Sequence, residues 1–319
     1  MAGQIAELYG YLDRDTSDKA VNAAIEAQCP FIRDDCVKTI NLHGRSVWAG
    51  ACTVRQKRQD APDVICCPLR LYAGDYALLD EISRLAFGES APKYPGREAV
   101  DRALLAGEPS IAVFGHRWGK ELRLPKRGGS GNYFVDWILA KVEADGKVSD
   151  FCAVEVQTID TTGNYRSSLE SLSASDRLNS WSTLGLNWEN VNKRILPQII
   201  YKASVLSRET YCRSGLFLVT PEPVNQAITQ RLGGESNIER VGRLQPSSIT
   251  LVSYDFAAEA FEPGVPRKLE IKNILMTNVS EVKDAFNRAQ LPEPNVYGSA
   301  LTRALKTPFC ETQIPRVFR

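Results

Sequence analysis

Histidine is almost absent from this sequence of 319 residues, which contains only His43 and His116. This scarcity disfavours metal sites built from several imidazoles, including histidine-rich metal fingers. A Ser-His-Asp hydrolase would have to use one of these two residues, and neither stands in a recognisable context.

Long apolar runs and an excess of charge of either sign are also missing. The apolar runs span only a few residues, far below the roughly 20 that a membrane helix needs, and the first 30 residues lack the apolar core of a signal peptide. Lys and Arg number 39 against 38 Asp and Glu, a net charge of +1, so any binding of nucleic acid must use local basic patches. We expect a cytoplasmic protein with no membrane segment.

Apolar residues make up 43% of the chain and charged residues 24%, which is ordinary for a globular protein with its own core. The helices expected from periodicity and capping cover 18–27, 76–87, 97–106, 187–207 with a break at Pro197, 223–232, 280–290 and 297–306. The expected strands cover 111–115, 120–124, 133–143, 151–159, 215–220, 249–256 and 268–276. This order predicts one α/β core, residues 73–319, with a cysteine-rich N-terminal region, residues 1–72.

The cysteines are unevenly distributed. Five of the eight fall between positions 29 and 67, namely Cys29, Cys36, Cys52, Cys66 and Cys67. Clustered thiols in a chain without expected disulfides favour a metal site, and four of these residues would complete a tetrahedral one. Residues 29–70 are expected to lack regular structure, and such a long irregular segment needs a cross-link, such as a bound metal, to hold it in place. However, no pair has the tight Cys-x2-Cys spacing, and the alternative is a set of small buried apolar side chains.

Two carboxylates and an amide stand on neighbouring expected strands. Asp136 lies on the first strand and Glu155 and Gln157 share one face of the second, with Asp145-Gly146 as the turn between them. Buried carboxylates that meet across a hairpin suit Mg²⁺, and Mg²⁺ beside a phosphodiester supports hydrolysis. This is the layout of the PD-(D/E)xK nucleases, with a mixed central sheet flanked by helices, except that Gln replaces the usual Lys.

A second set of residues fits the same pattern. Asp255, Glu270 and Lys272 retain the lysine. The segment 267–272 alternates charged and apolar residues, as a half-exposed strand does, and a loop rather than a tight turn separates it from Asp255. We therefore favour the middle set.

Several segments together resemble one family. They are Cys29-Pro30-Phe31, Cys36-Val37-Lys38, Cys52-Thr53-Val54, Cys67-Pro68, Glu121-Leu122, Val135-Asp136-Trp137, Leu139-Ala140-Lys141-Val142-Glu143, Val154-Glu155-Val156-Gln157-Thr158-Ile159-Asp160 and Gly163-Asn164-Tyr165. In this order they resemble the NotI family of type II restriction endonucleases. A further likeness at Leu269-Glu270-Ile271-Lys272, where the family has Arg in last place, suggests a structural role for the C-terminal set.

The resemblance implies a prokaryotic, Mg²⁺-dependent homodimer that cleaves double-stranded DNA at a palindromic, GC-rich site. It implies a cognate DNA methyltransferase in the same system, with no stable complex between the two. The implied catalytic residues are Asp136, Glu155 and Gln157, with Glu121 as an additional acid. The implied ligands of a structural iron are Cys29, Cys36, Cys52 and Cys67. Zinc also accepts four thiolates, Cys66 could replace Cys67, and the first cysteine gap is shorter than in the family.

Basic residues surround Glu121 in the sequence. With His116, they are Arg117, Lys120, Arg123, Lys126 and Arg127. We expect these residues to contact DNA phosphates or bases. The alternative interpretation is an ordinary solvent-exposed surface with no role in binding. A second basic run, residues 55–58, could contact the DNA backbone.

Two other functions remain open from the sequence. One is a DNA-binding module in which the carboxylates are structural, and the other is a repair or recombination nuclease of the same fold that reads DNA structure. Incubation with plasmid and Mg²⁺ separates the first from a restriction enzyme, and a preference for branched DNA would identify the second.

Overall fold

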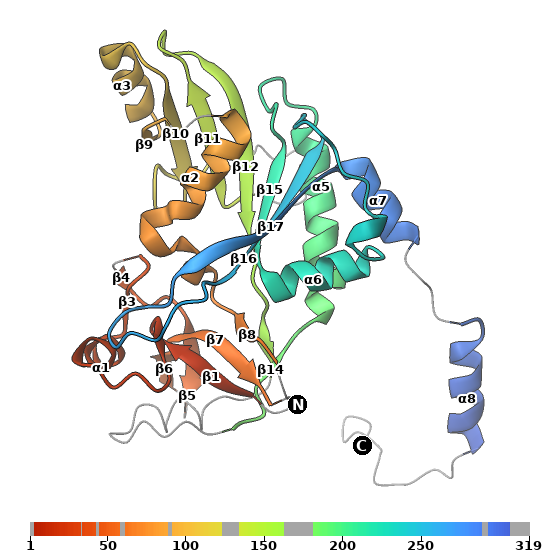
Figure 1. The fold of residues 1–319 in the computed structure, drawn as a ribbon. Helices are drawn as coiled ribbons and strands as arrows, with labels where there is room; N and C mark the ends of the chain where they lie inside the picture. Colours follow the sequence, from red (N-terminus) through yellow and green to blue (C-terminus); the bar gives the residue numbers. More distant parts are fainter. Residues whose placement is uncertain are drawn as a thin grey trace.

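The computed structural model describes residues 3–32, 34–42, 45–57, 61–88, 91–122, 134–162, 181–288 and 293–306. Its largest element is a mixed sheet of seven strands: β9 (Lys93–Pro95), β10 (Ser110–Gly115), β11 (Trp137–Val142), β12 (Val148–Val156), β15 (Leu216–Pro221), β16 (Ser248–Phe256) and β17 (Leu269–Asn278). The strand order across the sheet is β17-β16-β15-β12-β11-β10-β9 (Figure 1). The expected α/β architecture with a mixed central sheet is therefore confirmed.

Strand direction divides this sheet into two parts. Strands β10, β11 and β12 form an antiparallel meander, whereas β12, β15 and β16 run parallel to one another. Every residue of β15 is buried, as expected for a central strand whose two faces are both covered by helices. The junction of the two parts, β12, lies in the middle of the sheet.

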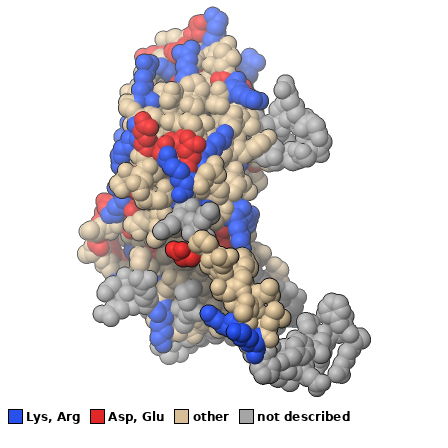
Figure 2. All heavy atoms as spheres, turned by 90° about the vertical axis from the view of Figure 1, so that its right-hand side faces the viewer, with Lys and Arg blue, Asp and Glu red and all other residues tan. Residues whose placement is uncertain are grey.

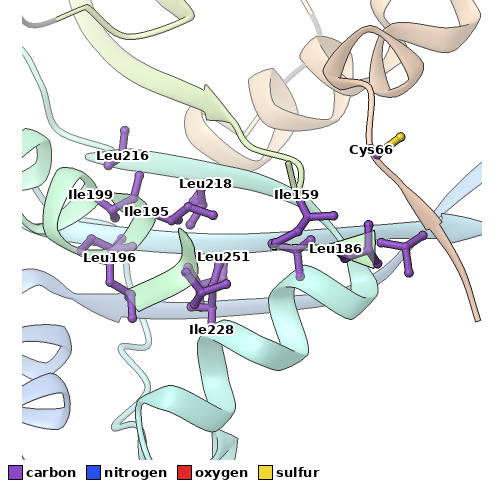
Figure 3. Close-up of a cluster of buried hydrophobic side chains, with 14 of the residues drawn as sticks. Cys66, Ile159, Leu186, Ile195, Leu196, Ile199, Leu216, Leu218, Ile228 and Leu251 are labelled. Atoms are coloured by element: carbon purple, nitrogen blue, oxygen red, sulfur yellow. The ribbon is translucent and has the colours of Figure 1, made fainter. Parts of the chain in front are cut away.

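Helices cover both faces. The 3₁₀ helix η1 (Pro68–Tyr72) and α2 (Ala73–Phe87) pack on one face. The π-helix η2 (Val191–Ile195), α5 (Leu196–Leu206), α6 (Glu222–Arg231) and α7 (Val279–Arg288) pack on the other (Figure 1). Figure 3 shows the core on this second face, where the labelled side chains include Ile195, Leu196, Ile199, Leu216, Leu218, Ile228 and Leu251.

The N-terminal region forms a small sheet of its own. Its strands are β1 (Gly3–Leu8), β2 (Tyr11–Leu12), β7 (Ala51–Gln56) and β8 (Asp63–Ile65), in the order β2-β1-β7-β8. Two short hairpins, β3 (Gln28–Cys29) with β4 (Asp34–Asp35) and β5 (Thr39–Leu42) with β6 (Arg45–Trp48), lie between them in the chain. The expectation that 29–70 lacks regular structure was wrong. Its strands leave a weak local pattern because they have only two to six residues, and one of them, β7, pairs with the distant strand β1.

A buried ion-pair network joins this small sheet to the rest of the protein. Glu7 of β1 is fully buried and pairs with Arg70 at 3.1 Å and with Arg267 at 3.0 Å. Thr53 of β7 donates a hydrogen bond to the same carboxylate at 2.5 Å. Arg267 also pairs with Asp63 of β8 at 3.0 Å. The network therefore ties three N-terminal strands, β1, β7 and β8, to η1 and to the segment before β17.

Most of the expected elements are present within a few residues. The first helix is α1 (Asp18–Ile25), where the Ser17 hydroxyl accepts a hydrogen bond from Ala20 N as an N-cap. Helix α2 ends at Gly88, and α3 (Glu98–Ala106) ends at Gly107, both glycines having a left-handed φ. The strand expected over 120–124 is absent from residues 120–122, and residues 123 and 124 lie outside the described part. Gly119 and Lys120 have φ of 85° and 66°, which turns the chain away from an extended path.

The remaining elements are short or peripheral. They are β13 (Thr161–Thr162), β14 (Gly185–Leu186), the 3₁₀ helix η3 (Glu235–Asn237) and α8 (Val296–Lys306). Helix α8 stands apart from the other elements (Figure 1). On the face turned to the viewer in Figure 2, basic and acidic side chains stand beside one another. None of the described helices combines the length and the apolar character needed to cross a membrane.

Candidate active site

The hairpin of β11 and β12 brings the two expected carboxylates together. Trp137 pairs with Val154, so Asp136, the residue before β11, lies opposite Glu155. The backbone N–H of Val156 donates to Asp136 Oδ2 at 2.7 Å. The turn between the strands is closed at Asp145, whose carboxylate accepts from Lys147 N at 3.0 Å. The proposed hairpin and the meeting of its acids are thus confirmed.

The two oxygens of Glu155 have different surroundings. The residue is only 3% exposed, because it lies near the end of β12 on the face covered by α5. Oε1 accepts a hydrogen bond from Gln157 Nε2 at 3.1 Å and an ion pair from Lys202 Nζ at 2.5 Å. Oε2 is buried and has no hydrogen-bond partner among the described residues. A buried acceptor left unsatisfied is costly, so this oxygen is available to a ligand.

Burial and the neighbouring charge also affect Asp136. Loss of solvation, with the charge of Glu155 as the second cause, raises the pKa of Asp136 from its usual 3.8 to about 7, although Lys202 and the Val156 N–H act in the opposite direction. The negative charge of Glu121 makes the smallest contribution to the raised pKa. A cation beside these carboxylates would remove the repulsion between them.

A cavity of about 820 Å³ opens beside Asp136. Its lining includes Asp136 and Gln157 from the hairpin, and Lys38, Cys67 and Tyr72 from the N-terminal side. The indole N–H of Trp137, the residue after Asp136, donates to the hydroxyl of Tyr72 at 3.1 Å. The cysteine-rich region therefore forms one wall of the candidate active site.

The basic residues expected around Glu121 are only partly within the described chain. Lys120 is exposed, and Arg117 pairs with Asp34 of the N-terminal region at 3.1 Å. His116 is exposed as well. Arg123, Lys126 and Arg127 lie outside the described residues, as do Gly163-Asn164-Tyr165. In the second basic run, Arg55 pairs with Asp63 at 2.8 Å and so helps to hold β7 to β8.

The clustered cysteines are all buried. Cys29, Cys52 and Cys67 share one cluster with Phe31, and Cys36 is near enough to raise the pKa of Cys29. Cys66 points elsewhere, since its thiol donates to the carbonyls of Ala51 and Cys52 and accepts from Lys38 Nζ.

Burial raises the pKa of Cys29, while the backbone N–H groups of Phe31 and Ile32 oppose this rise. For Cys67, burial raises the pKa to about 12, and the N–H of Leu69 opposes it. Across the described chain, no group of three or more His, Cys, Asp or Glu side chains is arranged as a ready-made metal site.

The competing residues also meet. Asp255 and Glu270 are cross-strand partners in β16 and β17, so the intervening loop does not separate them as the sequence suggested. However, Glu270 is half exposed and Lys272 pairs with it at 2.5 Å. Burial raises the pKa of Asp255, but β17 alternates between half-buried and exposed positions at this end, as expected.

Sequence reasoning missed Lys202 and Tyr72. Lys202 is the only charged residue of α5, and a single charge in an otherwise uncharged helix was a signal that could have been used. Tyr72 stands five residues after Cys67 and carried no comparable signal.

Buried carboxylates at adjoining strand ends, with one oxygen unsatisfied, can hold a divalent cation of the kind that phosphodiester hydrolysis uses. A family model described as restriction endonuclease NotI matches residues 16–215, well over half of the chain. The chain therefore belongs to the NotI restriction endonuclease family. The resemblance seen in the sequence is confirmed, and the protein is a nuclease that acts on double-stranded DNA. A search of curated proteins found no match. The matched range contains Asp136, Glu155 and Gln157 but excludes Asp255, Glu270 and Lys272.

Proposed function

We propose that this chain is a Mg²⁺-dependent type II restriction endonuclease of PD-(D/E)xK fold, and that Asp136 and Glu155 hold the catalytic cation. The observation that carries this proposal is the buried, unpartnered Oε2 of Glu155, opposite Asp136. Carboxylate oxygens are the ligands that Mg²⁺ prefers. The donor set therefore fits this ion.

Each residue of the site has a proposed part in hydrolysis. Bound between Asp136 and Glu155, a Mg²⁺ ion would supply Lewis-acid stabilisation of the charge that builds up on the phosphate. Gln157 donates its amide N–H to Glu155, which leaves its amide oxygen to accept a hydrogen bond from the attacking water. Glu121 would act as an additional acid, and its negative charge contributes to the raised pKa of Asp136.

The proposed substrate is a palindromic, GC-rich duplex cut by a homodimer. A symmetric pair of subunits presents one active site to each strand of a palindrome. The proposed contacts to the DNA come from five basic residues, Arg117, Lys120, Arg123, Lys126 and Arg127. Arg117 would first have to leave its ion pair with Asp34. A cognate methyltransferase would protect the host's own sites without a stable complex.

We also propose a structural role for the N-terminal region, residues 1–72, apart from the nuclease domain, residues 73–319. Cys29, Cys36, Cys52 and Cys67 would hold one iron or zinc ion as thiolates. The shared cluster of three of these thiols supports this, as do the backbone N–H groups directed at Cys29 and Cys67. The orientation of Cys66 supports Cys67 as the fourth ligand.

Cleavage of plasmid DNA in Mg²⁺ tests the catalytic assignment. Asp136→Ala and Glu155→Ala should each lower the cleavage rate by at least about a thousandfold, because each removes several kcal/mol of transition-state stabilisation. Binding of the specific duplex, measured in Ca²⁺, should remain. Lys272→Ala is the matched control from the competing motif and should cut as the wild type does. Full cutting by either alanine variant, or an inactive Lys272→Ala, would refute the assignment.

A further inference from the structure

Lys202 stands in an unusual place for a lysine. Its side chain is 13% exposed, and it belongs to α5, whose other residues are uncharged. The apolar hollow that it lines, of about 450 Å³, includes Phe134, Val135 and Tyr201. A charged group so nearly buried requires a partner, and its partner is Glu155 Oε1 at 2.5 Å.

The catalytic hairpin lacks the positive charge that this pattern of residues usually carries. Position 157 is Gln, and its amide donates to Glu155 Oε1 at 3.1 Å, the same oxygen that Lys202 contacts. The amide can orient a carboxylate but adds no net charge. In the described chain, the ammonium group in direct contact with Glu155 therefore comes from α5, 47 residues beyond it in the sequence.

We propose that Lys202 is a positioning residue of the cleavage site, which supplies from α5 the positive charge that position 157 lacks. Together with Gln157 it occupies Oε1 and so directs the unsatisfied Oε2 of Glu155 toward the catalytic cation. This inference rests on the proposed function, because it assigns Lys202 a part in the same site.

A structural role alone would have a different signature. If Lys202 only neutralised Glu155, its replacement would lower the free energy of unfolding but leave the cleavage rate of the folded protein at saturating Mg²⁺ unchanged. If Lys202 positions the carboxylate, removal of its charge slows cleavage at saturating Mg²⁺. Affinity for a divalent cation then stays equal or becomes tighter, since one positive charge beside the ligand is gone.

The variant that separates these cases is Lys202→Met, whose unbranched side chain is one atom shorter than that of lysine and carries no charge. We expect its cleavage rate at saturating Mg²⁺ to fall at least about tenfold, with no loss of Mn²⁺ affinity by calorimetry. Lys202→Arg should retain more activity than Lys202→Met. Lys193→Ala, an exposed lysine of η2 paired with Glu189, is the matched control and should cut within about twofold of wild type.

Gln157→Lys in the Lys202→Met background completes the test. If the rate falls because the positive charge is lost, a lysine at position 157 restores part of the rate. If the rate falls because Lys202→Met packs poorly, a lysine at position 157 does not restore it. The double variant and Lys202→Arg also decide the matter should Lys202→Met fail to fold. Lys202→Met that cuts within about twofold of wild type, or a double variant no faster than Lys202→Met, overturns the proposal. A wild type that does not cut DNA refutes the proposed function itself, so the two failures are distinct.

Discussion

Asp136 and Glu155 share one site but differ in what surrounds each carboxylate. Glu155 receives two donors on one oxygen, whereas Asp136 receives one backbone N–H and has its pKa raised to about 7 by burial and by Glu155. Without a divalent cation, Asp136 therefore holds a proton at pH values where an exposed carboxyl is ionised. This difference can be measured as a dependence of stability on pH.

We predict that the metal-free protein loses stability as pH rises from about 4 to about 7 through Asp136. In this window the folded state binds more protons than the unfolded chain, because the folded pKa is raised, so the free energy of unfolding falls as pH rises. Asp136→Asn cannot titrate. Its free energy of unfolding minus that of wild type should therefore grow between pH 5 and pH 8 in urea melts with chelator present. An equal difference at both pH values would contradict the raised pKa.

The sequence predicted the residues of the site only where a local pattern, such as strand alternation or a tight turn, fixes their relative positions. Alternation along a strand placed Glu155 and Gln157 on one face, and a tight turn placed Asp136 opposite. Lys202 reaches Glu155 from a helix that follows a long intervening segment, and no local periodicity reports which strand a helix covers. The sequence singles out Lys202 as the one charged residue of its helix, but only the fold shows that its partner is Glu155.

Among the elements, the N-terminal strands were the least predictable. Strand β1 pairs with β7 through contacts such as Gly3 with Gln56, which are far apart in sequence, and β8 has only three residues. Short strands stabilised by distant partners leave a weak local signal. The central strands were predictable because β15 is a nearly continuous apolar run and β16 is rich in β-branched and aromatic residues.

The ion-pair network of Glu7 gives a prediction about how these elements are held together. Glu7→Gln should lower the free energy of unfolding by about 3–5 kcal/mol, because it leaves the buried guanidinium of Arg70 without its counter-charge. Urea unfolding measures this change. Asp101→Asn, which removes one partner of an exposed ion pair in α3, is the control and should leave stability unchanged. Equal effects of the two substitutions would show that the network does not join the elements as described.

The proposed cysteine site gives a second prediction at this scale. Cys52→Ala should lose the bound iron or zinc and lower the yield of folded protein, because metal binding there contributes folding free energy. Cys152→Ala, in the sheet core and outside the cluster, should keep the metal, and Cys212→Ala likewise. Elemental analysis of the purified variants measures this. A wild-type protein with clearly less than one equivalent of transition metal would contradict the proposal.

At the scale of the whole molecule, direct contacts join the N-terminal region to the seven-stranded sheet. Tyr72, which follows the last clustered cysteine, contacts the residue next to Asp136, and Thr158, just beyond Gln157, donates to the carbonyl of Cys66 at 3.3 Å. A change in the cysteine cluster should thus reach the active site through a short path of contacts. Membership of the NotI family covers both parts, since the match begins at residue 16 and continues beyond Lys202.

Sequencing the ends of DNA cut by the purified protein tests the central claim most directly. If the chain is a type II restriction endonuclease acting through Asp136 and Glu155, digestion in Mg²⁺ gives ends that all lie at one palindromic sequence, at the same offset on both strands. Glu155→Ala then gives no such ends. Ends scattered without a common sequence, or the same ends from Glu155→Ala, would contradict the account.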